Sequence, residues 1–265
     1  MRHLLFPCLV AVASCTAPGA GEADGPLLIA HRGNSSEAPE NTLAAMRSAL
    51  ALGAPPELVE IDVHTSRDGE LVVIHDATLE RTTDGQGAVA EKSWDEIRGL
   101  DAGFADRFGL RFTGERVPSL DEVLDAVAGT GTGVMIEVKV HGAGGSAARL
   151  VVQRGEMDRH LIASFEPDVV VDASLEHPGI RTMLISGRAT DEVVELASRI
   201  GASVLGVDHG GLTPQIVEQA HSKELELWCW TVDDEERAAE LLRWGVDGII
   251  TNRPAAMRSL AALRR

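Results

Sequence analysis

Lysine, cysteine and positive charge are all scarce in this sequence. Among its 24 basic residues only three are lysines, Lys92, Lys139 and Lys223. The formal net charge is −17, which argues against a nucleic-acid partner and against electrostatic docking on anionic lipid. A negative field of this size repels a phosphorylated substrate unless cations are placed locally. Lys139 is a candidate for such a cation, because of its place in the predicted fold.

Cysteine is nearly absent, and the three that occur do not suggest a disulfide framework. Cys8 and Cys15 lie within or at the end of a segment that we expect to be processed, which leaves Cys229 as the one unmodified thiol. A single thiol makes no internal disulfide. Cys229 lies in a strand-like run between two tryptophans, and we expect it to be a buried small apolar residue.

The N-terminus has the pattern of an export signal. A short basic start precedes an apolar run over residues 4–13, too short to span a bilayer. The VASC sequence at 12–15 resembles the cleavage box of a bacterial lipoprotein signal. This resemblance implies that residues 1–14 are removed and Cys15 is lipidated, with 15–26 as a flexible tether. An ordinary secretory signal cut later is the alternative. Either way we expect an exported protein of the bacterial cell envelope, in contact with membrane only through a lipid anchor.

Residues 59–76 (VEIDVHTSRDGELVVIHD) predict a β-hairpin with a polar face. Apolar and polar residues alternate along its first arm, as in a strand. The Asp-Gly pair at 68–69 is a strong signal for a tight turn. If the turn is centred on this pair, Asp62 lies opposite His75, and Glu60 shares their face. Burying unpaired carboxylates is costly, so a bound cation would explain their convergence. A solvated polar face is the alternative.

Strands and helices are expected to alternate along the rest of the chain. Runs of apolar and β-branched residues predict nine strands, which begin near residues 27, 59, 71, 133, 160, 181, 204, 225 and 248. The second and third are too closely connected for a parallel crossover and must be antiparallel. Without that hairpin return, eight strands separated by helices remain, which predicts an α/β fold, a closed (β/α)₈ TIM barrel. An open doubly wound sheet is the alternative, but the chain lacks a Gly-rich dinucleotide fingerprint.

One domain is expected to contain all of these elements. It covers residues 27–265 and includes a long insertion-like connection over 77–117, rich in Gly and charge. Capping boxes at Ser93 and Ser119 mark two helix starts. Asn41 is expected to cap a further helix that follows it. We find no large internal repeat in the sequence and no mature stretch with the length and apolarity of a membrane span.

Seven polar residues fall at strand ends on one edge of the expected barrel. Because the chemistry of TIM barrels gathers at the C-terminal ends of the strands, these residues are expected to share one mouth. They are His31, Arg32, Glu60, Asp62, His75, Glu137 and Lys139. Each also has a separate structural explanation, such as a rim charge, a loop histidine or a buried ion pair. It is improbable that all seven residues reach the same barrel mouth by coincidence.

The residue types in this group indicate phosphodiester chemistry. Its three carboxylates form a hard oxygen site suited to Mg²⁺ or Ca²⁺, whereas zinc would favour more His or Cys ligands. Arg32 and Lys139 supply positive charge for a phosphate. His31 and His75 form an acid–base pair, in which one deprotonates a nucleophile and the other protonates a leaving oxygen. Together these groups predict metal-assisted cleavage of a phosphodiester.

These motifs together resemble those of the glycerophosphodiester phosphodiesterase family, within the wider phosphatidylinositol-phospholipase-type barrel group. The resemblance covers nearly the whole mature chain. Its blocks are HRG at 31–33, PENT at 39–42, the E-x-D-V…T-x-x-D-G…V-x-H-D signature at 60–76, VPSLDEVL at 117–124, EVK at 137–139, SF at 164–165, WTV at 230–232 and GIIT at 248–251. Asn252 stands where the family usually has Asp, which weakens any role for this position.

The resemblance implies a TIM barrel that cleaves deacylated phospholipids. Glycerophosphocholine and glycerophosphoethanolamine are the implied substrates, and glycerol 3-phosphate and an alcohol are the products. The implied roles are binding of one divalent cation, Mg²⁺ or Ca²⁺, by Glu60, Asp62 and Glu137, acid–base catalysis by His31 and His75, and phosphate binding by Arg32 and Lys139. The attacking group stays open between water and the glycerol hydroxyl beside the phosphate.

Two aromatic residues and two other functions also stay open. Phe165 and Trp230 are candidates for lining the pocket beside the glycerol or the alcohol, with core packing as the alternative. Three phenylalanines in the 77–117 connection leave room for a lysophospholipase D or sphingomyelinase D-like activity, which would need an apolar channel for an acyl chain. A surface lipoprotein that only binds phosphodiesters is the third hypothesis. Its signature would be decay of the catalytic set, and none is seen.

Overall fold

The computed structural model describes residues 25–260 of the chain. The expected signal sequence, the expected lipidation site at Cys15 and nearly all of the expected tether lie outside the described residues. Within residues 25–260, none of the helices combines the length and the apolar character that crossing a membrane requires.

Eight parallel strands close into a barrel. Each strand hydrogen-bonds to its neighbours around the ring, and pairing of β1 with both β2 and β9 closes it. The ring strands are β1 (Leu27–Ala30), β2 (Leu58–Thr65), β4 (Gly133–Val138), β5 (Leu161–Ser164), β6 (Arg181–Ser186), β7 (Val204–Asp208), β8 (Glu226–Trp230) and β9 (Gly248–Thr251). The additional strand β3 (Leu71–Val73) pairs antiparallel with β2, outside the ring. The predicted TIM barrel with one extra hairpin strand is therefore confirmed.

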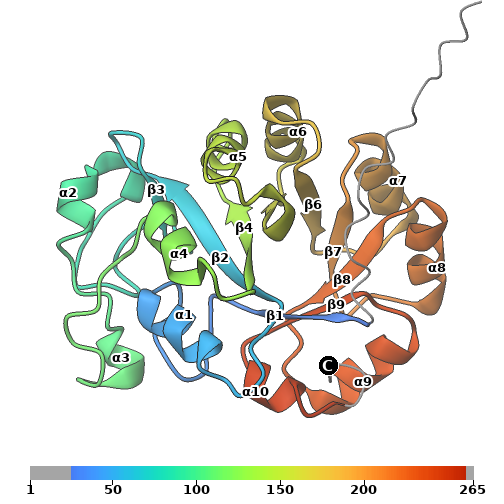
Figure 1. Cartoon of the computed structure of the whole chain (residues 1–265), viewed down its shortest axis with the longest axis horizontal. Coiled ribbons are helices and arrows are strands. Elements are labelled where there is room, and N and C mark those ends of the chain that lie inside the picture. Colours follow the sequence, from blue (N-terminus) through green and yellow to red (C-terminus); the bar gives the residue numbers. More distant parts are fainter. Residues whose placement is uncertain (1–24, 261–265) are drawn as a thin grey trace, which may run out of the picture.

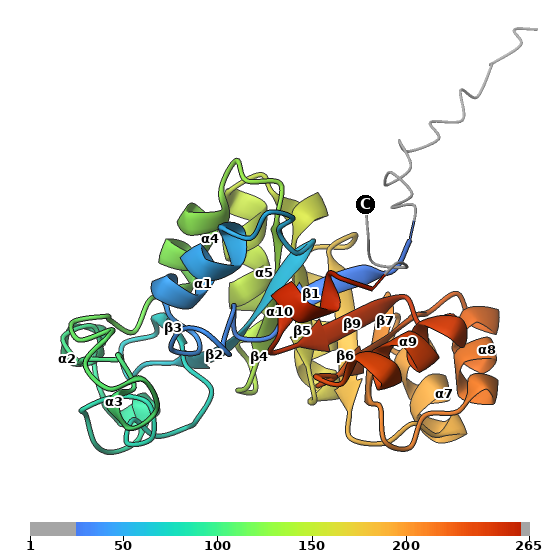
Figure 2. The same ribbon diagram turned by 90° about the horizontal axis from the view of Figure 1, so that it is seen from below.

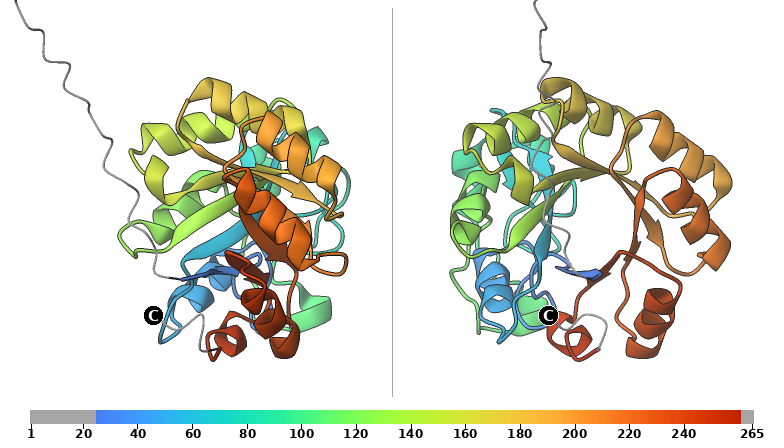
Figure 3. Two further views of the ribbon diagram at one scale, coloured as in Figure 1. Left: turned by 90° about the vertical axis from the view of Figure 1, so that its right-hand side faces the viewer. Right: turned by 45° about the vertical axis from the view of Figure 1, so that its right-hand side comes forward.

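Helices lie between successive strands and surround the ring (Figure 3). They are α1 (Leu43–Leu50), α2 (Trp94–Ile97), α3 (Ala105–Phe108), α4 (Leu120–Val127), α5 (Gly144–Gln153), α6 (Pro167–Glu176), α7 (Asp191–Arg199), α8 (Pro214–Ser222), α9 (Glu235–Arg243) and α10 (Pro254–Met257), with short 3₁₀ turns η1 (Val89–Glu91) and η2 (Met157–Arg159). The predicted capping boxes at Ser93 and Ser119 are confirmed, since each serine accepts a backbone hydrogen bond at the start of its helix.

Two layers of apolar side chains stabilise the barrel. The inner layer takes at least one residue from each of the eight ring strands: Ile29, Leu58, Met135, Leu161, Ala163, Met183, Ile185, Val204, Trp228 and Ile250. The outer layer joins alternate strand residues such as Val59 and Ile61 to residues of α1 and α4. Because side chains alternate along a strand, Glu60 and Asp62 share the inner face of Leu58.

Cys229 lies on β8 and is fully buried, as predicted. Burial raises the pKa of its thiol to about 12. The side chain is therefore a neutral apolar group at physiological pH, and it serves the packing between β8 and the helices around it.

The hairpin between β2 and β3 has a different register from the predicted one. The Ile74 N–H donates to the Asp62 carbonyl over 3.0 Å, so Ile74 lies opposite Asp62. The predicted cross-strand pair of Asp62 with His75 is therefore wrong. His75 comes one residue later, after β3 has ended at Val73, and lies on the connection that leads into the 77–117 segment.

The turn of the hairpin explains the shift. The Ser66 N–H bonds to the Glu70 carbonyl over 2.9 Å, and three residues lie between them. Gly69 has φ of +92°, the left-handed conformation that completes a three-residue turn. An Asp-Gly pair suits both a two-residue and a three-residue turn, and these two turns differ by one residue in the pairing that they impose.

The first helix is capped by Thr42 and not by Asn41. Thr42 Oγ1 accepts a hydrogen bond from the Ala45 N–H over 3.3 Å. Asn41 has φ of +59°, a left-handed conformation that asparagine tolerates better than most residues. The prediction of an Asn41 cap is therefore wrong. This conformation leaves the Asn41 side chain available for a contact with β2.

The connection over 77–117 packs beside the hairpin, on the side of the molecule opposite α7 and α8 (Figures 1 and 2). It contains η1, α2 and α3. Its buried apolar residues, including Leu79, Val89 and Ile97, form one cluster with Val72 and Ile74 of the hairpin arm. The hairpin therefore joins this connection to the barrel mouth.

Candidate active site

Three carboxylates meet inside the barrel at the C-terminal ends of β2 and β4. Glu60 and Asp62 continue the inner face of β2, and Glu137 does the same on β4, where it pairs directly with Asp62. All three side chains are buried. One carboxylate oxygen of each lies within 4.8 Å of the other two. The structure thus brings together the three residues that the sequence suggests as metal ligands.

Two cationic side chains lie against these carboxylates. Lys139 Nζ lies 2.8 Å from Asp62 Oδ1 and forms a second ion pair with Glu137. Arg32 Nε lies 3.2 Å from Asp62 Oδ2, and the Arg32 backbone N–H donates to Glu60 Oε2 over 2.8 Å. Arg32 also has φ of +53°, a strained conformation of the kind that concentrates at functional sites. Three negative charges therefore face two positive ones.

The electrostatics reflect this excess of negative charge. Burial raises the pKa of Glu60 well above its usual range, and repulsion from Asp62 and Glu137 adds to the effect. Burial and repulsion from Asp62 likewise raise the pKa of Glu137. At Asp62 burial acts in the same direction, but Lys139 and Arg32 outweigh it and lower the pKa to about 2. Glu60 Oε1 is buried and has no hydrogen-bond partner among residues 25–260. An unpaired oxygen in such a group fits a divalent cation with oxygen ligands.

His31 lies at the end of β1 and has one partner for each ring nitrogen. Its Nε2 lies 3.9 Å from Glu60 Oε2, and its Nδ1 lies 2.7 Å from Asn252 Oδ1. Asn252 Nδ2 donates to Asp233 over 2.6 Å, which turns Asn252 Oδ1 toward the imidazole. Burial and the nearby Arg32 charge lower the pKa of His31 to about 4. The asparagine that departs from the family pattern is thus a direct partner of His31.

His75 lies at the same mouth, on the connection after β3. Its Nδ1 lies 2.7 Å from Asp76 Oδ1. Its backbone carbonyl is 3.0 Å from His64 Nε2, which ties the connection to β2. The His75 side chain is 34% exposed, so part of the ring faces solvent. Asp76 therefore orients the imidazole of His75.

Glu40 and Asn41 also contact the site, although no sequence pattern reveals these contacts. Asn41 Nδ2 donates to Asp62 Oδ2 over 2.7 Å, and Asn41 Oδ1 accepts from the Asp62 N–H over 3.1 Å. Glu40 Oε1 accepts from Arg32 Nη1 over 2.7 Å. Both residues belong to the PENT block, but only the left-handed backbone of Asn41 turns its amide toward β2.

Phe165 and Trp230 lie at the ends of β5 and β8 and contact each other edge to face. Their ring centroids are 5.5 Å apart with an interplanar angle of 82°. Phe165 is 42% exposed, and Lys139 Nζ lies 5.9 Å from its ring centroid. Trp230 is partly buried and packs on the inner apolar layer. Phe165 thus borders the site, whereas Trp230 supports it from the barrel interior.

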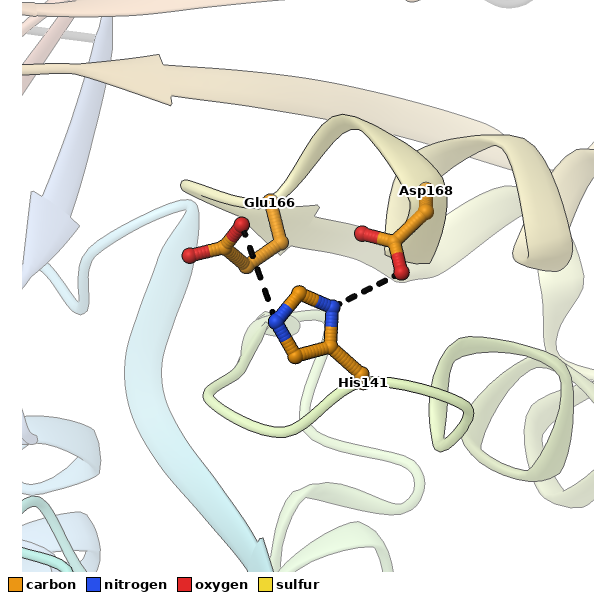
Figure 4. A group of neighbouring side chains, drawn as sticks. All are labelled: His141, Glu166 and Asp168. Atoms are coloured by element: carbon orange, nitrogen blue, oxygen red, sulfur yellow. Dashed lines mark hydrogen bonds and ion pairs between the residues drawn. The ribbon is translucent and has the colours of Figure 1, made fainter.

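A second group with metal-ligand chemistry lies on the rim, after β4 and β5 (Figure 4). His141 Nδ1 lies 2.7 Å from Asp168 Oδ2, and its Nε2 lies 3.9 Å from Glu166 Oε2. These side chains are 47–69% exposed. The hydrogen bond to Asp168 and its charge raise the pKa of His141. The sequence gives no motif or alternation that singles out this group.

Comparison with known proteins agrees with this architecture. Residues 31–256 match the sequence profile described as the Glycerophosphoryl diester phosphodiesterase family. The chain belongs to this family. The matched range contains every residue of the site described above, and it confirms the resemblance and the expected enzyme class, a phosphoric diester hydrolase.

Members of the family match this chain over most of its length. A glycerophosphodiester phosphodiesterase of Caldanaerobacter subterraneus subsp. tengcongensis is 36% identical over 239 residues, which cover 88% of this chain and 97% of the relative. A crystal structure of the Agrobacterium tumefaciens enzyme is 33% identical, with a TM-score of 0.78 and coverage of 89% and 100%. An Oleispira antarctica phosphodiesterase, in complex with the product sn-glycerol-3-phosphate, is 29% identical, with a TM-score of 0.80 and coverage of 89% and 96%.

Proposed function

We propose that this protein hydrolyses glycerophosphodiesters such as glycerophosphocholine in a divalent-cation-dependent reaction, with His31 and His75 as the proton-transfer pair. The observation that carries the proposal is the convergence of three buried carboxylates, two cations and two imidazoles at one barrel mouth. The product named for the Oleispira antarctica complex, sn-glycerol-3-phosphate, is one of the two products that such a hydrolysis releases. The other product is the alcohol.

Glu60, Asp62 and Glu137 are the residues that would hold the cation. Their oxygen-only donor set suits Mg²⁺ or Ca²⁺, and the unpaired Glu60 Oε1 and the excess negative charge of the group fit such an ion. When bound, the cation supplies charge neutralisation to the phosphate oxygens. Arg32 and Lys139 lie directly beside the carboxylates. They add the positive charge that a phosphate needs in an otherwise acidic protein.

The hydrogen bonds of His31 suit it to the role of general base. Because Asn252 Nδ2 donates a hydrogen bond to Asp233, Asn252 Oδ1 faces the imidazole and must accept a hydrogen bond from the His31 Nδ1–H. The lone pair is then on Nε2, on the side of the carboxylates. In this tautomer His31 can take a proton from water or from the glycerol hydroxyl beside the phosphate.

His75 is suited to the complementary role of general acid. The Asp76 carboxylate accepts a hydrogen bond from His75 Nδ1, so the ring keeps a fixed orientation. A proton on its other nitrogen can pass to the leaving alcohol oxygen as the bond between that oxygen and phosphorus breaks. The partly exposed position of His75 allows the alcohol to depart toward solvent.

The structure favours a deacylated substrate over a lysophospholipid. Phe104, Phe108 and Phe112 pack edge to face on one another, with centroids 6.3 and 5.4 Å apart. Of the three, Phe104 borders the cavity of about 310 Å³ in this connection, whose wall also carries Glu80, Asp84, Asp101 and Asp106. A wall with four carboxylates does not suit an acyl chain.

A product assay tests the proposed function and its alternatives. Purified protein, with Mg²⁺ or Ca²⁺ in parallel, would be given glycerophosphocholine, glycerophosphoethanolamine, lysophosphatidylcholine and sphingomyelin. We expect glycerol 3-phosphate from the first two. Choline release from the lipids, without glycerol 3-phosphate from either glycerophosphodiester, would favour a lysophospholipase D or sphingomyelinase D-like activity. Binding of glycerophosphocholine without any turnover would favour a phosphodiester-binding lipoprotein.

We further propose, from the sequence of residues 1–26, that the protein is exported and anchored to a bacterial membrane through a lipid on Cys15. The basic start, the apolar run and the VASC box support this proposal. Expression of the full chain in a bacterium with lipoprotein processing should place it in the membrane fraction, and Cys15→Ser should release it. Equal distribution of the two forms would contradict the anchor.

A further inference from the structure

Arg81 lies in the 77–117 connection, yet its guanidinium contacts two carboxylates at the barrel mouth. Its Nε and Nη2 donate to the two oxygens of Asp76 over 2.7 and 2.9 Å. Its Nη1 and Nη2 donate to the two oxygens of Glu40 over 3.0 and 2.8 Å. The Phe104 ring packs beside the guanidinium, 5.9 Å from its carbon. A planar guanidinium that holds two carboxylates in this paired way fixes the position of both.

Each of these carboxylates in turn holds one residue of the proposed machinery. Asp76 Oδ1 accepts from His75 Nδ1, and Glu40 Oε1 accepts from Arg32 Nη1, both over 2.7 Å. A continuous path of hydrogen bonds therefore runs from His75 to Arg32, with Arg81 at its centre. The path joins the loop before α1, the end of the hairpin and the start of the 77–117 connection.

We infer that Arg81 is a positioning residue, which holds the proton donor His75 and the phosphate-binding Arg32 at a fixed separation on one substrate. The inference rests on the roles proposed above for these two residues. It also assigns a function to the long connection after β3, which places Arg81 against the mouth from outside the barrel. Arg81 does not need to touch the substrate for this purpose.

The charge of Arg81 supports the same network. Its hydrogen bonds are the main cause that lowers the pKa of Asp76, with the His75 contact adding to it. Burial would raise the pKa of Glu40, but Arg81 and Arg32 outweigh it and lower that pKa. Both carboxylates therefore stay ionised at neutral pH and keep accepting hydrogen bonds from the groups that they position.

The test compares the steady-state kinetics of Arg81→Gln, Arg81→Lys and Arg81→Ala with those of the wild type on glycerophosphocholine. We expect Arg81→Gln to lower kcat by about 10- to 100-fold, because a misplaced group costs rate even when the chemistry is intact. Arg81→Lys restores the charge but not the paired geometry, so it should recover only part of the loss. Free guanidinium ion at millimolar concentration should raise the activity of Arg81→Ala.

Arg107→Gln is the matched control. Arg107 belongs to the same connection, and its guanidinium carbon lies 5.0 Å from the Phe108 ring centroid, in no contact with the network. This variant removes the same charge and should leave both kcat and the unfolding midpoint unchanged. Circular dichroism and thermal unfolding on all variants separate a local effect from loss of the fold.

Three outcomes would decide against the inference. One is a kcat for Arg81→Gln within about twofold of the wild type. Another is a loss of activity that follows a matching fall in the unfolding midpoint. A third is a loss of activity that added guanidinium does not reverse in Arg81→Ala and that Arg81→Lys does not reduce. Failure of the proposed function looks different, because then the wild type itself would release no glycerol 3-phosphate.

Discussion

Among residues 25–260, two groups of side chains have the composition of a metal site, and they differ in burial and in hydrogen bonding. Glu60, Asp62 and Glu137 are buried on the inner face of the barrel, with an unpaired oxygen. His141 and its two carboxylate partners are exposed on the rim, and the imidazole is already hydrogen-bonded to Asp168 (Figure 4). The inner carboxylates therefore carry excess negative charge away from water, whereas the rim group is a solvated ion pair.

Residue types alone therefore do not make a metal site. Water screens and solvates the rim carboxylates, so they gain little from a cation. The buried carboxylates lack this solvation, and the charges of Lys139 and Arg32 offset their mutual repulsion only in part. A divalent ion is therefore expected to bind strongly at the inner group and weakly, if at all, at the rim.

The largest expected effect comes from matched carboxylate-to-amide changes in the two groups. Asp62→Asn should reduce glycerol 3-phosphate release to the background of the assay, because the variant removes a proposed ligand and the charge that holds Lys139. Glu166→Gln removes the same chemical group from the rim and should leave the rate unchanged. Equal losses in the two variants would remove the distinction between the groups.

Removal of an imidazole should likewise affect the inner site and not the rim group. His31→Ala and His75→Ala should each lower kcat by about 100- to 10,000-fold, the range for a general acid or base. Thermal unfolding should stay nearly unchanged in both. His141→Ala is the control and should retain wild-type kcat. Near-normal turnover in either of the first two variants would refute the acid–base assignment.

The architecture was predictable from the sequence because each of its signals is local. Alternation, capping boxes and strand count predict the barrel, and the inner face of β2 follows from the period of two along that strand. The hairpin register was not predictable, since an Asp-Gly pair fits turns of two and of three residues. Gly69 takes the left-handed position of the three-residue turn, which moves His75 one place beyond the predicted pair.

The hydrogen-bond partners that position the central residues of the site were much less predictable than those residues themselves. Arg81 meets Glu40 across 41 positions, and His31 meets Asn252 across 221. Such pairings depend on how distant segments pack, and no period or short motif encodes them. The discounted role of Asn252 shows the same limit, because an amide and a carboxylate can offer the same oxygen to an imidazole.

Glu60→Gln is expected to have a smaller effect on stability, and it should stabilise the fold while it abolishes activity. Burial and repulsion raise the pKa of Glu60, so its charge opposes folding at neutral pH when chelator removes divalent ions. Glu60→Gln should then raise the unfolding midpoint by about 2–4 °C for each kcal/mol relieved, while abolishing turnover. Glu166→Gln, measured alongside, should not change the midpoint. A lower midpoint for Glu60→Gln in chelator would contradict the charge excess described here.

The smallest effect concerns the pH dependence of the rim pair. Because the Asp168 hydrogen bond raises the pKa of His141, their pairing stabilises the fold below the ordinary histidine pKa and is lost as the pH rises through the raised value. Both side chains are largely exposed, so the contribution is screened. Thermal unfolding of His141→Ala should match that of the wild type within error at pH 6 and at pH 9. A clear deficit at pH 6 that disappears at pH 9 would show that the rim pair matters more than its exposure suggests.

We expect the inner carboxylates, and not the rim group, to hold the divalent ion of the proposed reaction. The most direct measurement dialyses the wild type, Asp62→Asn and the triple rim variant His141→Ala/Glu166→Gln/Asp168→Asn against EDTA, then follows glycerol 3-phosphate release from glycerophosphocholine as Mg²⁺ or Ca²⁺ is added back. We expect no activity before addition, full recovery in the wild type and the rim variant, and none in Asp62→Asn. Full activity of the dialysed wild type in EDTA, or recovery in Asp62→Asn but not in the rim variant, would contradict an ion held by the inner carboxylates.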